Sequence, residues 1–141
     1  MTDTALAQTL IADLARALGV GALPAANDGG IALAAGDDVT VRLYPLATDL
    51  MVVVPLAPLP AHPDPARMTR VLASNHCDAP LAPFVVAADA QANLLLWGRV
   101  PLAGMTGEQL AGLIDRLGAE ARRLREEIGV DDADAEADAE A

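Results

Sequence analysis

The chain has 141 residues, which is the length of about one domain. Its 20 acidic residues outnumber nine basic ones, all of them arginine, for a formal net charge of −11 at pH 7. This charge excludes the basic footprint that nucleic-acid binding requires. The 53% hydrophobic content predicts a packed core, and a single cysteine excludes an intramolecular disulfide.

No segment has the features of a membrane span or an export signal. The longest apolar run, residues 50–61, is interrupted by three prolines and is much shorter than the roughly 20 residues that a membrane-spanning helix needs. The first residues hold no basic cluster before an apolar stretch. We therefore expect a soluble cytoplasmic protein without membrane insertion.

The first predicted element is a helix over residues 4–18. Asp3 or Thr4 is placed to cap its start, and Gly19 or Gly21 to end it. Residues 19–30, which contain several glycines and a proline, follow as a loop. The apolar stripe of the helix repeats every four residues and consists of Leu6, Leu10, Leu14 and Leu18.

Three strands are predicted next, over residues 31–34, 39–44 and 50–54. Gly36-Asp37-Asp38 between the first two is a turn that favours antiparallel pairing. Apolar and polar residues alternate in the second strand, which predicts one dry and one wet face. The third strand is apolar throughout, which is typical of a central strand or of one covered on both faces. The prolines after it predict no further regular pairing.

A second helix begins with Asp64 as the N-cap and Pro65 in its first turn, and Asn75 is expected to close it. We expect its apolar residues to face one way. A second hairpin then joins residues 84–88 to 94–100 through a turn at 89–93.

The last predicted helix spans residues 107–128. Thr106 and Gln109 form a capping box at its start, and Gly129 is placed to cap its end. Residues 131–141 then hold six acidic and no basic residues, which leaves −5 on the rest of the chain. Because such a block repels itself, we expect a disordered, solubilising tail.

The order of elements is therefore α-β-β-β-α-β-β-α. Short connections between the strands favour antiparallel pairing. We predict a single α+β domain over residues 1–130, with a mostly antiparallel twisted sheet and helices on one face, followed by the disordered acidic tail at 131–141.

No constellation for catalysis stands out. His76 and Cys77 are adjacent without the orienting third group that an activated thiol needs, and Cys77 is expected to be a small buried apolar residue. His62 and His76 lack two further ligands at metal-binding spacing. The chain has no lysine for a phosphate-binding loop. We therefore predict no enzyme, no cofactor and no metal site.

Strands 50–54 and 94–100 are apolar on both faces. A sheet with helices on one face leaves its other face to solvent, so the second apolar face needs a cover. Either the last helix provides that cover, or a partner or second copy does. Apolar patches on an acidic, soluble protein mark binding sites.

Four stretches carry a resemblance to a known family. Residues 72–76 (LASNH) are similar to the end of the family's second helix, and 83–89 (PFVVAAD), 93–102 (NLLLWGRVPL) and 105–110 (MTGEQL) are similar to the hairpin and helix that follow. With its size, acidity and order of elements, the chain resembles the class I type III secretion chaperones, the Tir-chaperone (CesT-like) family, over about residues 4–128.

The resemblance implies a homodimer in the bacterial cytoplasm that serves virulence. Such a dimer binds the N-terminal region of one or more secreted effectors, without ATP, and keeps them soluble and secretion-competent. The secretion-apparatus ATPase is a further implied partner. The implied dimer interface comprises Met68, Val71, Leu72, Leu95 and Trp97. The implied effector-binding grooves, built by the first helix and the sheet, comprise Leu10, Leu14, Leu18, Val41 and Leu43.

Two alternatives remain open. The same fold could serve a regulator or adaptor outside secretion that binds a cytoplasmic protein, because a fold does not determine a function. An enzyme of an unrecognised class would require polar groups that converge in a pocket.

The charge of −5 on the body would steer basic or neutral clients toward the chain.

Overall fold

The computed structural model describes residues 3–21, 23, 30–36, 38–79 and 83–129, and the elements in them follow the predicted order. The predicted tail at 131–141 lies outside the described residues. The helices are α1 (Asp3–Leu18), α2 (Pro65–Ala73) and α3 (Gly107–Ile128). The strands are β1 (Ile31–Ala34), β2 (Thr40–Pro45), β3 (Asp49–Pro58), β4 (Val85–Ala88) and β5 (Asn93–Pro101).

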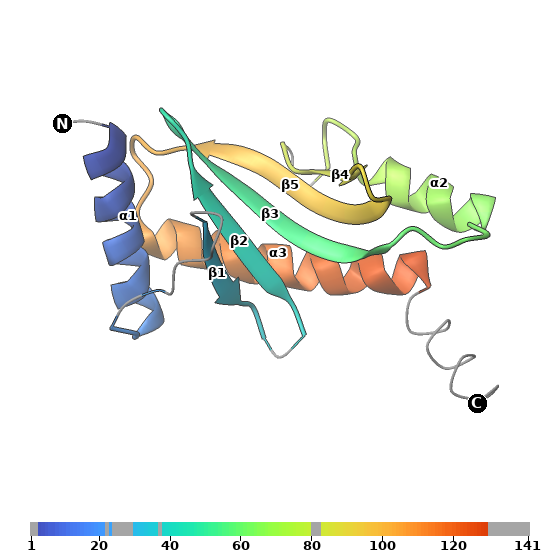
Figure 1. Cartoon of the computed structure of the whole chain (residues 1–141), viewed down its shortest axis with the longest axis horizontal. Helices are drawn as coiled ribbons and strands as arrows, with labels where there is room; N and C mark the ends of the chain where they lie inside the picture. Colours follow the sequence, from blue (N-terminus) through green and yellow to red (C-terminus); the bar gives the residue numbers. More distant parts are fainter. Residues whose placement is uncertain (1–2, 22, 24–29, 37, 80–82, 130–141) are drawn as a thin grey trace.

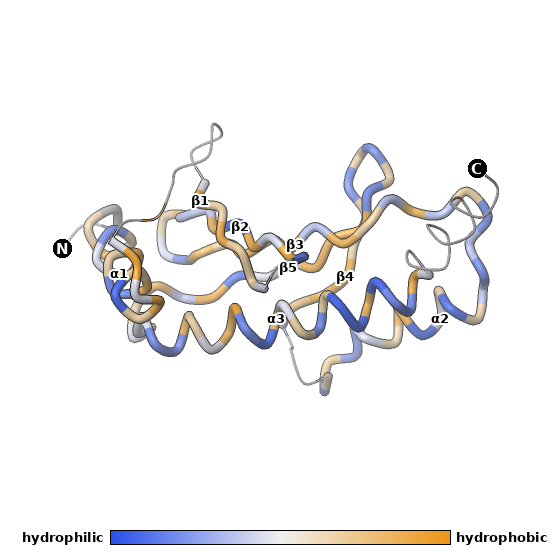
Figure 2. Tube along the Cα trace, turned by 90° about the horizontal axis from the view of Figure 1, so that it is seen from below, coloured by the Kyte–Doolittle hydropathy of each residue, from blue (hydrophilic) through white to orange (hydrophobic). Residues whose placement is uncertain are grey.

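The five strands form one sheet in the order β1-β2-β3-β5-β4, and every neighbouring pair is antiparallel. The long helix α3 runs beneath the sheet, α1 crosses one end of α3, and α2 lies beside the other end (Figures 1 and 2). The predicted α+β fold, with its antiparallel sheet and its helices on one side, is confirmed.

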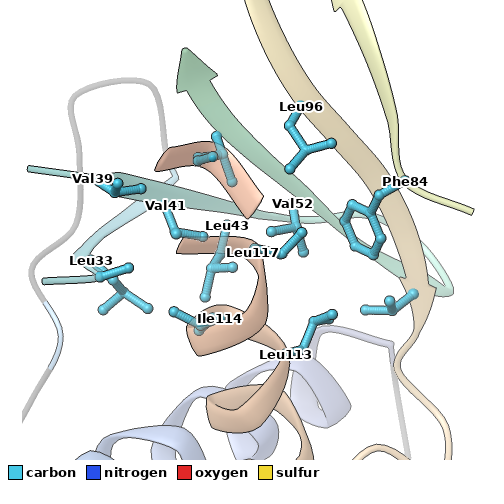
Figure 3. Packing of buried hydrophobic residues seen from close by; sticks show 14 of the residues in the cluster. Leu33, Val39, Val41, Leu43, Val52, Phe84, Leu96, Leu113, Ile114 and Leu117 are labelled. Atoms are coloured by element: carbon cyan, nitrogen blue, oxygen red, sulfur yellow. The ribbon is translucent and has the colours of Figure 1, made fainter. Parts of the chain in front are cut away.

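The core lies between the sheet and the helices. Inward residues from β1, β2, β3 and β5 meet the apolar stripe of α3, as Figure 3 shows for Val41, Leu43 and Val52 against Leu117. Leucine rather than aromatic side chains supplies most of the bulk, in keeping with a chain of 2% aromatic residues. The wholly buried leucines are Leu14, Leu43, Leu50, Leu110, Leu117 and Leu124.

The prediction that regular pairing ends at Pro55 is wrong. Strand β3 continues to Pro58 and stays paired with β5, with an irregularity in the pairing between Pro55 and Ala57. The proline is tolerated because β2 pairs with β3 only as far as Val53, so one edge of β3 is free of strand partners beyond that point. The Arg125 guanidinium of α3 donates to the carbonyls of Leu56 (2.9 Å) and Pro55 (3.3 Å).

The predicted N-caps of α2 and α3 and the predicted C-cap of α3 are confirmed. Asp64 accepts a hydrogen bond from the Ala66 amide (3.1 Å), with Pro65 in the first turn. Thr106 and Gln109 form the reciprocal capping box of α3, and Gly129 ends that helix in the left-handed conformation, with φ of 89°. Helix α2 ends earlier than predicted, with Ser74 as its C-cap.

Candidate functional site

One face of the sheet carries no described helix. Along β3 and β5 every second side chain is buried against the helices, while the residues between them are partly exposed. Figure 2 shows α2 and α3 along one side of the strands only. We call the other side the open face and define it by Arg42, Tyr44, Met51, Val53, Pro55, Leu95, Trp97 and Arg99.

The pairing of the strands places these side chains in rows. Val53 lies opposite both Arg42 on β2 and Trp97 on β5, and Trp97 lies opposite Val85 on β4. In the next row, Met51 lies opposite both Tyr44 and Arg99. The open face is therefore an apolar stripe with an arginine on each side of it. The predicted second apolar face is confirmed, and α3 does not cover it.

A groove of about 620 Å³ lies on the open face. Tyr44, Met51 and Leu95 are among its apolar lining, and Arg42 and Asp89 are the charged residues that line it. Hydrogen bonds from the Asn93 and Gln91 amides lower the pKa of the Asp89 carboxyl. That carboxylate therefore belongs to its own turn, and the groove is suited to apolar side chains next to a guanidinium.

The predicted dimer residues lie in two separate places, on strand β5 and on helix α2. Leu95 and Trp97 lie partly exposed on the open face. On α2, Val71 is buried in the core, Met68 packs partly against the core, and Leu72 is 64% exposed. The expectation that the apolar residues of α2 face one way is therefore wrong for Leu72. The assignment of all five to a dimer interface remains a prediction.

Four of the five predicted effector-binding residues lie in the core. Leu14, Val41 and Leu43 have no exposed surface, and Leu10 is 3% exposed, because α3 packs against both α1 and β2. Leu18, at the end of α1, is 41% exposed. The expectation that all five residues line an open groove is therefore wrong. Of the five, only Leu18 is exposed enough to contact a bound segment directly. Its part in effector binding remains a prediction.

The loop after α2 brings together three exposed side chains. Cys77 is exposed, contrary to the prediction of a buried apolar residue, because the chain has left α2 and turns away from the core at this point. Donor atoms of His76, Cys77 and Asp78 lie within 4.8 Å of one another. The Nδ1 atom of His76 already accepts a hydrogen bond from the Asp78 amide (3.1 Å).

A polar hollow of about 430 Å³ lies between this loop, α2 and α3. Its arginines are engaged in ion pairs, Arg70 with Glu127 and Arg123 with Glu120. The hydrogen bond with Glu120 raises the pKa of the Arg123 guanidinium. Among the described residues, no polar or charged side chain is buried. The arrangement is that of a solvated, internally paired surface.

The described helices include none that is long and apolar enough to cross a membrane.

The sequence matches the model of the Tir chaperone protein (CesT) family over residues 9–125. No match is found among curated protein sequences. Among solved structures, a chain of the heterodimeric ExoU–SpcU complex from the type III secretion system of Pseudomonas aeruginosa is 28% identical, with a TM-score of 0.67 over 90% of this chain and 97% of that chain.

Two further solved structures are similar in fold. A chain of the ExsC–ExsE complex is 20% identical, with a TM-score of 0.70 over 89% of this chain and 96% of that chain. A chain of the Yersinia pestis type III secretion chaperone SycH in complex with a stable fragment of YscM2 is 22% identical, with a TM-score of 0.66 over 87% of this chain and 99% of that chain.

Proposed function

Because the chain belongs to the Tir chaperone protein (CesT) family, we propose that it binds the N-terminal segment of one or more secreted effectors and keeps them soluble and secretion-competent. It does so as a homodimer in the bacterial cytoplasm and without ATP. The secretion-apparatus ATPase is a further proposed partner, which receives the loaded chaperone.

The open face is the observation that supports this proposal most directly. A chain with a net charge of −11 is suited to stay dissolved, yet its sheet presents Met51, Val53, Leu95 and Trp97 on a side that no described helix covers. Apolar surface of this kind marks a binding site. An unfolded segment with scattered apolar residues can lie across such a rigid surface, and the cost of ordering it keeps the complex releasable.

We divide the available surface between two partners. The β4–β5 part of the open face, with Leu95 and Trp97, is proposed to meet a second copy of the chain, and Leu72 on α2 is a further candidate contact. The exposed end of α1 at Leu18 and the β2–β3 part of the open face are proposed to hold the effector. A two-fold dimer presents two such surfaces to one client, which increases the overall affinity.

The experiment is a tagged pull-down from the native bacterium, with mass spectrometry of the co-eluting proteins and light scattering of the complex. One dominant secreted protein, bound through its N-terminal region to two copies of the chain, supports the proposal. The complex should survive depletion of ATP. A dimer that brings down a cytoplasmic regulator instead would make the chain an adaptor of the same fold, and a monomer would overturn the proposed dimer.

A further inference from the structure

Among the described residues, Arg42 differs from most arginines in forming no ion pair. Five of the nine arginines form ion pairs with carboxylates, and Arg125 is held by carbonyls of β3 and of the β1–β2 turn. Arg42 forms no ion pair within the described part of the chain, and its side chain is exposed on the open face. Within the part of the chain that the structure describes, a positive charge without an ion pair thus lies at the margin of the open face.

The surroundings of Arg42 define what kind of group it can meet. It lies opposite Val53 and lines the same groove as Met51 and Leu95. Asp89 also lines this groove, but its carboxylate accepts hydrogen bonds from the Gln91 amide (2.9 Å) and the Asn93 amide (3.0 Å) of its own turn. The groove therefore offers an apolar floor and a guanidinium that forms no ion pair among the described residues, while the ionised Asp89 carboxylate is held in its own turn.

We propose that this groove binds an extended peptide segment in which a carboxylate side chain, next to apolar ones, pairs with Arg42. The apolar side chains of the segment pack on Met51 and Val53, in the β2–β3 part of the open face. This inference rests on the proposed function, which makes the segment part of a secreted protein, and adds the chemistry by which the segment is chosen. A guanidinium suits this role because its planar donors bind a carboxylate in two parallel hydrogen bonds.

The acidity of the whole chain does not oppose such a contact. Long-range steering by the net charge is screened beyond about 8–10 Å at physiological ionic strength. A carboxylate that has reached the groove responds to the guanidinium within hydrogen-bonding distance. The expectation of basic or neutral clients, drawn from the net charge alone, therefore does not extend to the residue that faces Arg42.

A peptide-display selection on the full-length chain tests this inference without knowledge of the client. Random peptides are selected on the wild type, on Arg42→Glu and on Arg116→Glu. Arg116 is the matched control, because it is exposed on α3, on the other side of the sheet, and also forms no ion pair among the described residues. Circular dichroism confirms that both variants fold.

We expect the wild type and Arg116→Glu to enrich peptides with Asp or Glu beside apolar residues, and Arg42→Glu to enrich Lys or Arg at that position. Trp97, the only tryptophan, lies on the open face and reports binding by its fluorescence. For an acidic peptide selected on the wild type, Arg42→Glu should raise Kd about tenfold, and exchange of the peptide's acid for lysine should restore binding to the variant.

Three results would overturn the inference. They are the absence of enriched peptides, the same peptides on wild type and Arg42→Glu, and a change of oligomeric state in Arg42→Glu, which would make the groove a contact between copies. The proposed function fails separately. If the pull-down yields a secreted partner but the selected peptides show no preference for an acidic residue, only this inference fails. If the peptides show that preference but the pull-down yields no secreted partner, only the proposed function fails.

Discussion

The side chain of Asn75 forms two hydrogen bonds with the backbone of β4 of the kind that a neighbouring strand would form. Its amide accepts a hydrogen bond from the Val86 amide (2.7 Å) and donates one to the Val86 carbonyl (3.1 Å). Strand β4 is an edge of the sheet, and its outward backbone groups would otherwise be available to another chain. The side-chain amide closes this edge at Val86 because it has the same donor and acceptor as a peptide group.

Replacement of this residue tests its contribution. Asn75→Ala should lower the free energy of unfolding by about 1–3 kcal/mol, because two partly buried backbone groups lose their partner. Asn75→Asp keeps an acceptor for the Val86 amide and should lose less. Urea denaturation measures both changes. Equal stability of Asn75→Ala and the wild type would show that water replaces the amide without cost.

The contact between Asp38 and Arg122 makes the stability of the fold depend on pH. The hydrogen bond from Arg122 lowers the pKa of the Asp38 carboxyl below the usual range, so the contact stabilises the fold above about pH 4 and is lost as the pH falls through the folded-state pKa. Asp38→Asn should therefore lose less thermal stability between pH 7 and pH 3 than the wild type. An identical loss of Tm in both proteins would contradict this role. The carboxyl is exposed to solvent, so the difference should be small.

Helix α3 packs against both other helices and against the sheet. Its first residue is Gly107, and the lack of a side chain there lets α1 approach closely. A Cβ atom on Gly107 would lie 2.4 Å from the Asp13 carbonyl of α1, whereas Gly112 of the same helix has nothing within 4 Å. Thermal denaturation should show Gly107→Ala to be destabilised, because α1 must shift. Gly112→Ala should gain up to about 1 kcal/mol from helix propensity. Equal effects of the two substitutions would show that α1 can shift to admit the added Cβ atom without loss of stability.

The burial of α1 also decides how its part in effector binding can be tested. Leu10→Asp would place a carboxylate in the core beneath α1, and we expect it to unfold the protein. Leu18→Asp, at the exposed end of the same helix, should keep the helical circular dichroism of the wild type and weaken capture of the client in a pull-down. Undiminished capture would remove Leu18 from the effector surface.

The local elements could be predicted from the sequence because their signals are local. The capping box at Thr106 and Gln109, the Asp64-Pro65 start of α2 and the alternation of β2 all act within a few residues of the chain. The course of β3 beyond Pro55 could not be predicted. It depends on where β2 stops pairing and on Arg125, which lies 70 residues away in the chain.

At the scale of the whole molecule, the β4–β5 part of the open face is the surface that a second copy is proposed to cover. Trp97→Asp or Leu95→Asp should convert the dimer to a monomer in light scattering, because a carboxylate would be desolvated in an apolar contact. Both side chains are partly exposed in the single chain, so circular dichroism should stay unchanged. Leu72→Asp is the matched variant on α2. Two dimeric open-face variants together with a monomeric Leu72→Asp would move the interface to the helices.

The sequence by itself determined the order of the elements, the start of α2, both caps of α3, the antiparallel hairpins and the surplus of apolar strand faces. Only the tertiary structure decided which apolar face remains available. Val41 and Leu43 form the dry side of β2, as the alternation predicts, but α3 already covers that side. An apolar face can be buried only once, so we expect binding on the opposite side, where Arg42 and Tyr44 lie. Periodicity shows that a strand has two faces, and the packing of a distant helix decides which one is used.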